Sequence, residues 1–357
     1  PLDNSAMDGY AVRCADVTAA GTQLPVSQRI AAGSVGAALR PGTAARIFTG
    51  APVPEGADAV VMQELCEAVE GGVRINTVPT PGMAIRRRGE DLARAALVLP
   101  RGLRLTPQAL GLAAAAGAAA LTVTRRPRVA LFSTGDELAM PGEALKPGGI
   151  YNSNRFVLRA LIQSLGCECT DLGIVPDQLD ATRAALRTAA HGHDLIVTSG
   201  GVSVGEEDHL KPAVQAEGSL DLWQMAIKPG KPLAFGSVRR AEGSSAWFVG
   251  LPGNPVSSFV TFLLAVRPVL LRLQGADPQP PQGIPMRADF DWPRADKRRE
   301  FLRVRRNAQG GLDLFSNQGS GVLTSTVWAD GVIDNPPENP IRRGDSVHFI
   351  SLAEWVA

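Results

Sequence analysis

The chain has 357 residues, enough for roughly two to four domains with hydrophobic cores of their own. Its 36 basic and 35 acidic residues give a formal net charge of +1, so binding of nucleic acid through bulk charge is not indicated. No run of about 18 apolar residues is present to cross a membrane, and the first residues lack the basic and apolar regions of a signal peptide. We therefore expect neither nucleic acid nor a membrane among the partners.

The cysteines favour a protein of the reducing cytoplasm. There are four, too few and too unevenly spaced for a disulfide framework. Cys167 and Cys169 could form one edge of a metal site, but no second Cys or His pair stands near them. We favour two thiols on one face of a strand.

Residues 1–95 predict a small β-rich domain, because the β-prone runs "AARIFTG", "DAVVMQE" and "GVRINTV" are separated by frequent Gly and Pro turns. A helical connecting and dimerisation segment is expected over residues 96–125. Thr106 can cap its helix and Pro107 suits the first turn, so the helix should begin there and run through the alanines that follow.

Residues 126–275 alternate buried strands with amphipathic helices, which predicts βαβ units. We expect a doubly wound, three-layer α/β domain with a mainly parallel sheet. After the proline-rich break that follows Gly275, residues 276–357 contain only strand-like runs: "REFLRVRR", "GLDLFSN", "GVLTSTVW" and "DSVHFISL". They predict a C-terminal antiparallel β-barrel, although a sandwich would give the same pattern.

Ligands of open parallel sheets bind beyond the carboxyl ends of the strands, so the loops at 132–138, 173–177, 198–208 and 249–258 should converge on one crevice. In "TSGGVSVGEED" the glycines permit close approach of the backbone to an anion. The loops around them supply candidate substrate contacts: Gly200, Gly201, Ser203, Gly253 and Asn254.

Acidic residues gather at the same predicted edge. Asp136, Glu137, Asp177 and Asp208 would form a costly concentration of like charge unless a cation lies between them. Oxygen ligands favour a hard ion, and Mg2+ bound partly through ligand phosphates is the natural choice. Glu206 and Glu207 are more typical of acids that complement a helix start.

Basic residues suggest a second, anion-binding part. Only five lysines occur, and Lys228 and Lys231 both fall in the turn "IKPGKP". Two ammonium groups three residues apart could bind an oxyanion, and the alternative is two solvated surface lysines. "GLPGNPVSS" is either a plain strand-to-helix turn or a further anion site formed by backbone amides with the Ser257 and Ser258 hydroxyls.

These segments together resemble the molybdopterin molybdenumtransferase family, the MoeA proteins and the gephyrin E domain. The resemblance rests on "SAMDGYAVR", "TGAPVPEGADAVVMQE", "RRRGEDL", "STGDEL", "SGGVSVGEED", "KPGKPLAFG" and "GLPGNPVS", in that order. It implies insertion of molybdate into adenylylated molybdopterin with Mg2+-dependent release of AMP. It also implies an elongated homodimer in which the barrel of one subunit faces the α/β domain of the other.

The resemblance assigns roles to individual residues. The implied catalytic positions are Asp8, Thr49, Asp91, Glu137, Asp177 and Asp208. Of these, Glu137, Asp177 and Asp208 are the implied metal ligands. The implied substrate contacts are Lys228, Lys231, Ser257, Arg303 and Ser325. Further implied partners are molybdopterin adenylyltransferase and molybdoenzyme chaperones.

Two positions depart from the family pattern: Gln224 stands where many relatives have lysine, and His209 where an aromatic residue is usual. Two alternative functions stay open. A molybdopterin adenylyltransferase would resemble residues 126–275 alone, and a gephyrin-like scaffold would bind partners without catalysis.

Overall fold

The computed structural model describes residues 1–202 and 209–356. The chain forms two compact units. One consists of residues 1–100 with 105–119, and the other of residues 101–104 with the chain from 120 onward. The two are described separately below.

The N-terminal unit is built on a six-stranded sheet in the order β5-β2-β4-β3-β7-β6. Its strands are β2 (Gly9–Val12), β3 (Thr22–Ile30), β4 (Ala44–Ile47), β5 (Ala59–Met62), β6 (Cys66–Val69) and β7 (Gly72–Ile75). Among them only β3 and β4 pair in parallel. A separate antiparallel pair joins β1 (Asn4–Ser5) to β8 (Ile85–Arg86). The predicted β-rich domain is confirmed, and its three predicted strands are β4, β5 and β7.

Helix α1 (Pro107–Ala115) begins as predicted, because the Thr106 hydroxyl accepts a hydrogen bond from the Ala109 N–H at 3.2 Å. It is shorter than predicted. Gly117 has a φ of +85°, a conformation that ends helices, so the later alanines do not continue α1.

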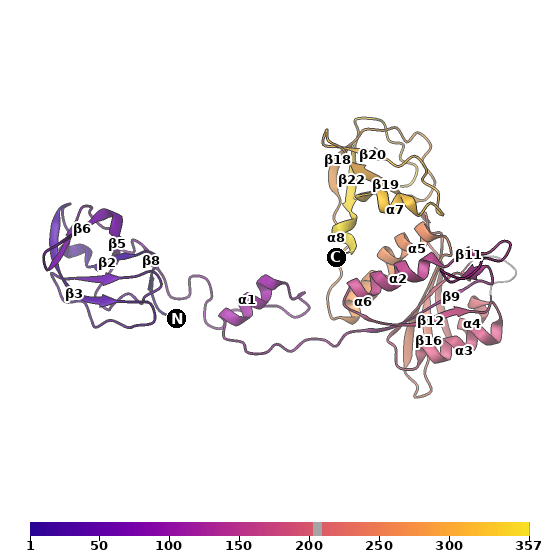
Figure 1. Ribbon diagram of the computed structural model, residues 1–357, viewed down its shortest axis with the longest axis horizontal. Coiled ribbons are helices and arrows are strands. Elements are labelled where there is room, and N and C mark those ends of the chain that lie inside the picture. The colour runs from indigo at the N-terminus through magenta and orange to yellow at the C-terminus, as the bar shows by residue number, and fades with distance from the viewer. Residues whose placement is uncertain (203–208, 357) are drawn as a thin grey trace. The chain divides into compact units, whose positions relative to one another are not determined.

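The α/β domain of the second unit has a six-stranded sheet in the order β12-β9-β13-β17-β16-β14. The four parallel strands are β9 (Arg128–Thr134), β12 (Glu168–Val175), β13 (Leu195–Ser199) and β17 (Ser245–Leu251). Helices cover both faces of this sheet (Figure 1). The core on one face includes α2 (Ser153–Ser164), α5 (Pro255–Thr261) and α6 (Arg267–Leu273). The core on the other face includes α3 (Leu179–Ala190) and α4 (Leu210–Glu217). The predicted three-layer domain is confirmed.

Three features of this domain were not predicted. Strands β14 (Gly218–Gln224) and β16 (Pro232–Arg239) extend the sheet with antiparallel pairs, and a short parallel pair joins β10 (Leu138–Ala139) to β11 (Ile150–Tyr151). A π-helical turn at Phe262–Val266 joins α5 to α6. Of the described residues, Pro255–Leu273 is the one helix with the length and mean hydropathy, 1.7, to cross a membrane. Half of it is buried in the domain core, which is typical of a core helix.

The C-terminal barrel closes through the ring β19-β20-β18-β22-β21-β19. Its strands are β18 (Ile284–Ala288), β19 (Arg299–Arg306), β20 (Gly311–Leu314), β21 (Gly331–Asn335) and β22 (Ser346–Ser351). The last described residues form helix α8 (Leu352–Val356). The barrel prediction is confirmed, with one parallel pair, β18–β20.

The predicted strand at residues 321–328 is wrong. Residues Thr324–Trp328 form helix α7. The Ser325 and Thr326 hydroxyls donate to the carbonyls of Val322 and Leu323, at 2.7 Å each. These hydrogen bonds stabilise a helical turn, although the β-branched residues of this segment favour a strand.

Candidate functional site

A cleft of about 950 Å3 lies at the carboxyl ends of the parallel strands. Strand order reverses between β9 and β13, and the loops after these strands diverge there, which is where ligands of open α/β sheets bind. The cleft is lined by the loops that follow β9, β12, β13 and β17, by the turn after β15 (Ile227–Lys228), and by residues 298, 318–321 and 323 of the barrel. It therefore combines the α/β domain with the barrel of the same chain.

Many predicted site residues line this cleft: Glu137, Asp177, Gly200, Gly201, Lys228, Lys231, Gly253, Asn254 and Ser257. Ser203 and Asp208 lie outside the described residues. Arg303 and Ser325 belong to the barrel and do not line the cleft, although Arg303 contacts the lining residue Gly319. Asp8, Thr49 and Asp91 belong to the N-terminal unit.

The glycine loop after β13 leaves no room for side chains. Gly200 and Gly201 have φ of +92° and +66°, and a Cβ on Gly200 would lie 2.4 Å from the carbonyl oxygen of Thr134 at the end of β9. Glycine is therefore required where the two strand ends meet. The bare backbone of this loop faces the cleft.

Asn154, which sequence reasoning missed, connects three of the cleft loops. This buried side chain near the start of α2 donates to the Ser199 hydroxyl at 2.8 Å and to the Gly253 carbonyl at 2.7 Å. It thereby holds the ends of β13 and β17 at a fixed separation.

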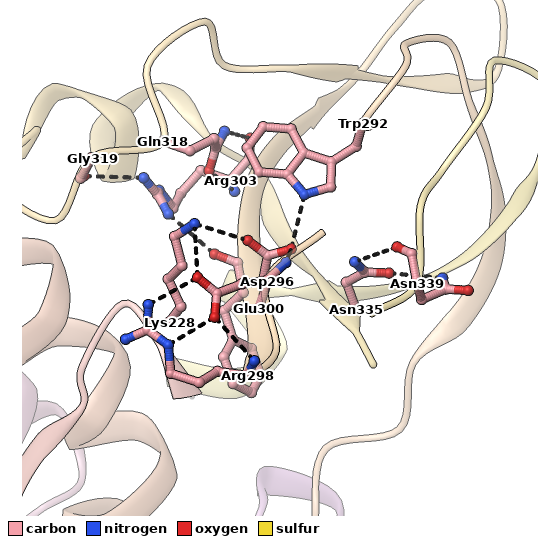
Figure 2. A network of polar contacts seen from close by, with 11 residues as sticks. Lys228, Trp292, Asp296, Arg298, Glu300, Arg303, Gln318, Gly319, Asn335 and Asn339 are labelled. Atoms are coloured by element: carbon pink, nitrogen blue, oxygen red, sulfur yellow. Dashed lines mark hydrogen bonds and ion pairs between the residues drawn. The ribbon is translucent and has the colours of Figure 1, made fainter. Parts of the chain in front are cut away.

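The lysine turn contacts the barrel. Figure 2 shows the Lys228 ammonium between two barrel carboxylates, 3.2 Å from Glu300 and 3.4 Å from Asp296. Arg298, another cleft residue that sequence reasoning missed, donates to both oxygens of Asp296 at 2.9 Å. These hydrogen bonds hold the pKa of the Asp296 carboxyl far below its usual range. Lys231 is exposed and has no ion pair among the described side chains.

Arg303 and Ser325, which the resemblance assigned to one site, are in contact. The guanidinium of Arg303 is 1% exposed and donates to the Ser325 hydroxyl at 3.2 Å and to the carbonyls of Phe301 and Gly319 at 3.1 and 3.2 Å. Because burial disfavours the charged form, the pKa of Arg303 falls to about 10. All three acceptors are neutral, so this positive charge has no carboxylate to compensate it in the described structure. Gly319 itself lines the cleft.

In the N-terminal unit, Asp8 and Thr49 are also in contact. The Thr49 N–H and hydroxyl both donate to the Asp8 carboxylate at 2.8 Å. These hydrogen bonds, with the nearby charge of Arg46, lower the pKa of Asp8. Asp91 is exposed in the loop after β8.

The carboxylates of the cleft suit a hard cation. Glu137 and Asp177 offer oxygen ligands, and Mg2+ commonly takes one or two protein carboxylates together with substrate phosphates. Within residues 1–202 and 209–356, no three His, Cys, Asp or Glu side chains come together, so the predicted set with Asp208 stays a prediction. Cys167 is buried and Cys169 half-buried, both as free thiols.

Three family profiles match the chain in order. The MoeA N-terminal region (domains I and II) matches residues 1–117, a probable molybdopterin binding domain matches 130–272, and the MoeA C-terminal region (domain IV) matches 285–352. The profiles thus account for the N-terminal unit, the α/β domain and the barrel in turn.

Comparisons with individual proteins support the same family. The molybdopterin molybdenumtransferase of Haemophilus influenzae is 45% identical over 276 residues, which is 77% of this chain and 67% of that protein. Molybdopterin molybdenumtransferase 2 of Mycobacterium tuberculosis is 40% identical over 351 residues, which is 94% of this chain and 85% of that protein. A crystal structure of the molybdopterin biosynthesis MoeA protein from Pyrococcus horikoshii superposes with a TM-score of 0.83 at 28% identity, over 98% of this chain and 88% of that one. The chain therefore belongs to the MoeA family of molybdopterin molybdenumtransferases, which are enzymes of molybdenum cofactor biosynthesis.

Proposed function

We propose that this enzyme inserts molybdate into adenylylated molybdopterin and releases AMP in a Mg2+-dependent step, giving molybdenum cofactor. The observation that carries the proposal is the division of charge in the cleft. Carboxylates of Glu137 and Asp177 line the part formed by the loops after β9 and β12, while Lys228, Lys231 and Arg298 line the part next to the barrel. Of these three cations, Lys228 and Arg298 pair with barrel carboxylates, and Lys231 has no ion pair among the described residues. A substrate with a pyrophosphate and a separate tetrahedral oxyanion needs both parts: carboxylates to hold a metal ion at the pyrophosphate, and cations to bind the oxyanion.

The glycine loop suits the phosphate-bearing substrate. Gly200, Gly201 and Gly253 present backbone without side chains, so a charged group can approach the peptide N–H groups closely. A Mg2+ ion held by Glu137 and Asp177, with Asp208 as the third predicted ligand, would neutralise phosphate charge. These residues fit such an ion by their ligand type.

The part of the cleft next to the barrel suits molybdate. Lys231 and Ser257 line the cleft, and the uncompensated positive charge of Arg303 lies directly behind Gly319. Cations and hydroxyl groups bind a doubly charged tetrahedral oxyanion, which acidic side chains would repel. The molybdenum would be captured by the pterin dithiolene sulfurs.

The protein contributes mainly position and electrostatics. Neither a Cys, the usual thiol nucleophile, nor a His, the usual general base, is among the described residues that line the cleft. Holding two anions close together against their repulsion, among side chains and backbone groups already in position, supplies the rate acceleration.

The direct test mixes purified protein with adenylylated molybdopterin, molybdate and Mg2+. Molybdate-triggered AMP release together with reconstitution of a molybdenum-free apoenzyme supports the proposal. Incorporation of AMP from ATP would instead identify an adenylyltransferase, and absence of both activities would favour a scaffold.

We also propose a cytoplasmic homodimer that receives its substrate from molybdopterin adenylyltransferase and passes its product to molybdoenzyme chaperones. Sedimentation equilibrium at micromolar concentration tests the dimer. A monomer that is fully active would contradict the assembly while leaving the reaction intact.

A further inference from the structure

The lysine turn is anchored in the barrel sheet. Strand β15 (Ile227–Lys228) pairs in parallel with the start of β19, so that Lys228 lies opposite Glu300. The turn itself is closed by a 2.8 Å hydrogen bond from the Met225 N–H to the Lys231 carbonyl. A Cβ on Gly230 would lie 2.5 Å from the Thr261 methyl group, so the turn also packs tightly on α5. The position of Lys231 is thus tied to that of β15.

Glu300 is the buried member of this anchor. Its side chain is 1% exposed. One carboxylate oxygen accepts from the Trp292 indole at 2.8 Å and from the Asp296 N–H at 3.2 Å. For the other oxygen, the Lys228 ammonium at 3.2 Å is the closest cation, and no hydrogen-bond donor among the described residues serves it otherwise. A buried carboxylate needs such a counter-charge, so Glu300 depends on Lys228, which also pairs with Asp296.

The two lysines of the turn consequently differ. Lys228 has two carboxylates within 3.4 Å, and neither Glu300 nor Asp296 lines the cleft. These two carboxylates therefore compensate most of the positive charge of Lys228, and they do so from outside the cleft. Lys231 lines the cleft without an ion pair in the described part of the chain, so its charge is available to a ligand.

We infer that Glu300 is a positioning residue of the active site. By holding Lys228, Glu300 fixes the lysine turn to the barrel and presents Lys231 to the molybdate. The inference rests on the proposed function for the identity of the anion, whereas the anchor itself stands on the contacts alone. It adds to the site a residue that does not line the cleft.

The kinetic test uses Glu300→Gln, which keeps the shape of the side chain and an acceptor for Trp292 but removes the closer of the two carboxylate charges that hold Lys228, while Asp296 stays in place. We expect the KM for molybdate to rise about tenfold with kcat nearly unchanged, as is typical when a side chain supporting a ligand contact is lost. Asp334→Asn is the matched control, because Asp334 pairs with Arg299 on the neighbouring strand and does not contact Lys228. Its KM should equal that of the unmodified enzyme. A lowered melting temperature with an unchanged KM in Glu300→Gln would overturn the inference.

A second measurement needs no turnover. In the unmodified protein, limited acetylation with acetic anhydride followed by tandem mass spectrometry should label Lys228 more slowly than Lys231, and Glu300→Gln should accelerate labelling of Lys228 alone. Equal rates that Glu300→Gln does not change would contradict the anchor even in an active enzyme. The expected labelling in a protein without molybdate-dependent AMP release would refute the proposed function and leave the anchor intact.

Discussion

Thr49 donates twice to the same carboxylate oxygen of Asp8, once from its backbone and once from its hydroxyl. Both hydrogen bonds favour the ionised form, which is why the pKa of Asp8 is lowered. The pair therefore contributes stability that is present above the ordinary carboxyl pKa and is lost as the pH falls through the lowered value.

Replacing Thr49 with valine removes one of these bonds and keeps the other. We expect the pKa of Asp8 to move part of the way back to its ordinary value, as measured by NMR titration of the carboxyl carbon. Thr43→Val is the control, because the Thr43 hydroxyl donates to the Arg40 carbonyl in the same unit and does not contact Asp8. An unchanged Asp8 titration in Thr49→Val would show that the hydroxyl bond does not form in solution.

Glu217 joins α3 to α4 through a second pH-sensitive contact. Its carboxylate accepts from Arg187 at 2.7 and 2.8 Å and from Arg183 at 2.7 Å, and these bonds lower the pKa of Glu217 from 4.5 to about 2. The stabilisation is complete above about pH 4.5 and disappears as the pH falls to about 2.

Glu217→Gln should therefore lower the melting temperature at pH 7, and the difference from the unmodified protein should shrink as the pH is lowered through that range. Glu67→Gln provides the comparison, since Glu67 forms a more exposed pair with Arg74. A constant difference between pH 7 and pH 2 would argue against the charged pairs as its source.

Asn154 should matter for stability because both of its acceptors would lose their donor. We expect Asn154→Ala to lower the free energy of unfolding by about 1 to 3 kcal/mol, the cost of leaving buried polar groups unsatisfied. Chemical denaturation measures this, with Asn76→Ala at an exposed position as the control. Equal stability of the two variants would mean that water replaces the Asn154 amide.

We expect the buried positive charge of Arg303 to be needed for molybdate binding. A ligand that binds the folded state raises its stability, by about 2.7 kcal/mol at a concentration one hundred times the Kd. Molybdate should therefore raise the melting temperature of the unmodified protein. We expect it to have little effect on Arg303→Met, which lacks the buried charge.

Arg305→Met is the control for this experiment, because Arg305 lies two residues along the same strand, is exposed and packs over Trp328 at 4.6 Å. It should keep the full response to molybdate. A full response in Arg303→Met would exclude the buried guanidinium from anion binding.

The sequence predicted what depends on local pattern. The five consecutive buried residues of β13, the Thr106 cap of α1 and the alternation of strands with helices all follow from burial, capping and periodicity. Because the parallel strands all end at one edge, their loops could be expected to meet in a cleft. Motif resemblance then supplied roles for residues such as Lys231 and Arg303.

What could not be predicted depends on contacts between distant segments. Asn154, Arg298 and Glu300 stand in sequence contexts that are equally typical of solvated polar residues. Only the folded barrel brings Glu300 to Lys228, and only the ends of β13 and β17 give Asn154 its acceptors. Helix α7 was missed for a local reason, since its β-branched residues have high strand propensity while their hydroxyl groups stabilise the helical turn.

The pairing of β15 with β19 also bears on how the protein can be divided. Ile227 and Lys228 precede the last strand and helices of the α/β domain in the chain, yet they hydrogen-bond to the barrel. A cut at the proline-rich break would give a barrel fragment without β15, whose Glu300 has lost its counter-ion. It would also give an α/β fragment in which the normally buried Ile227 is uncovered. The two fragments are therefore poor modules for expression or exchange between relatives, and the smallest self-sufficient piece of this part of the chain extends from before β9 to the end of the barrel.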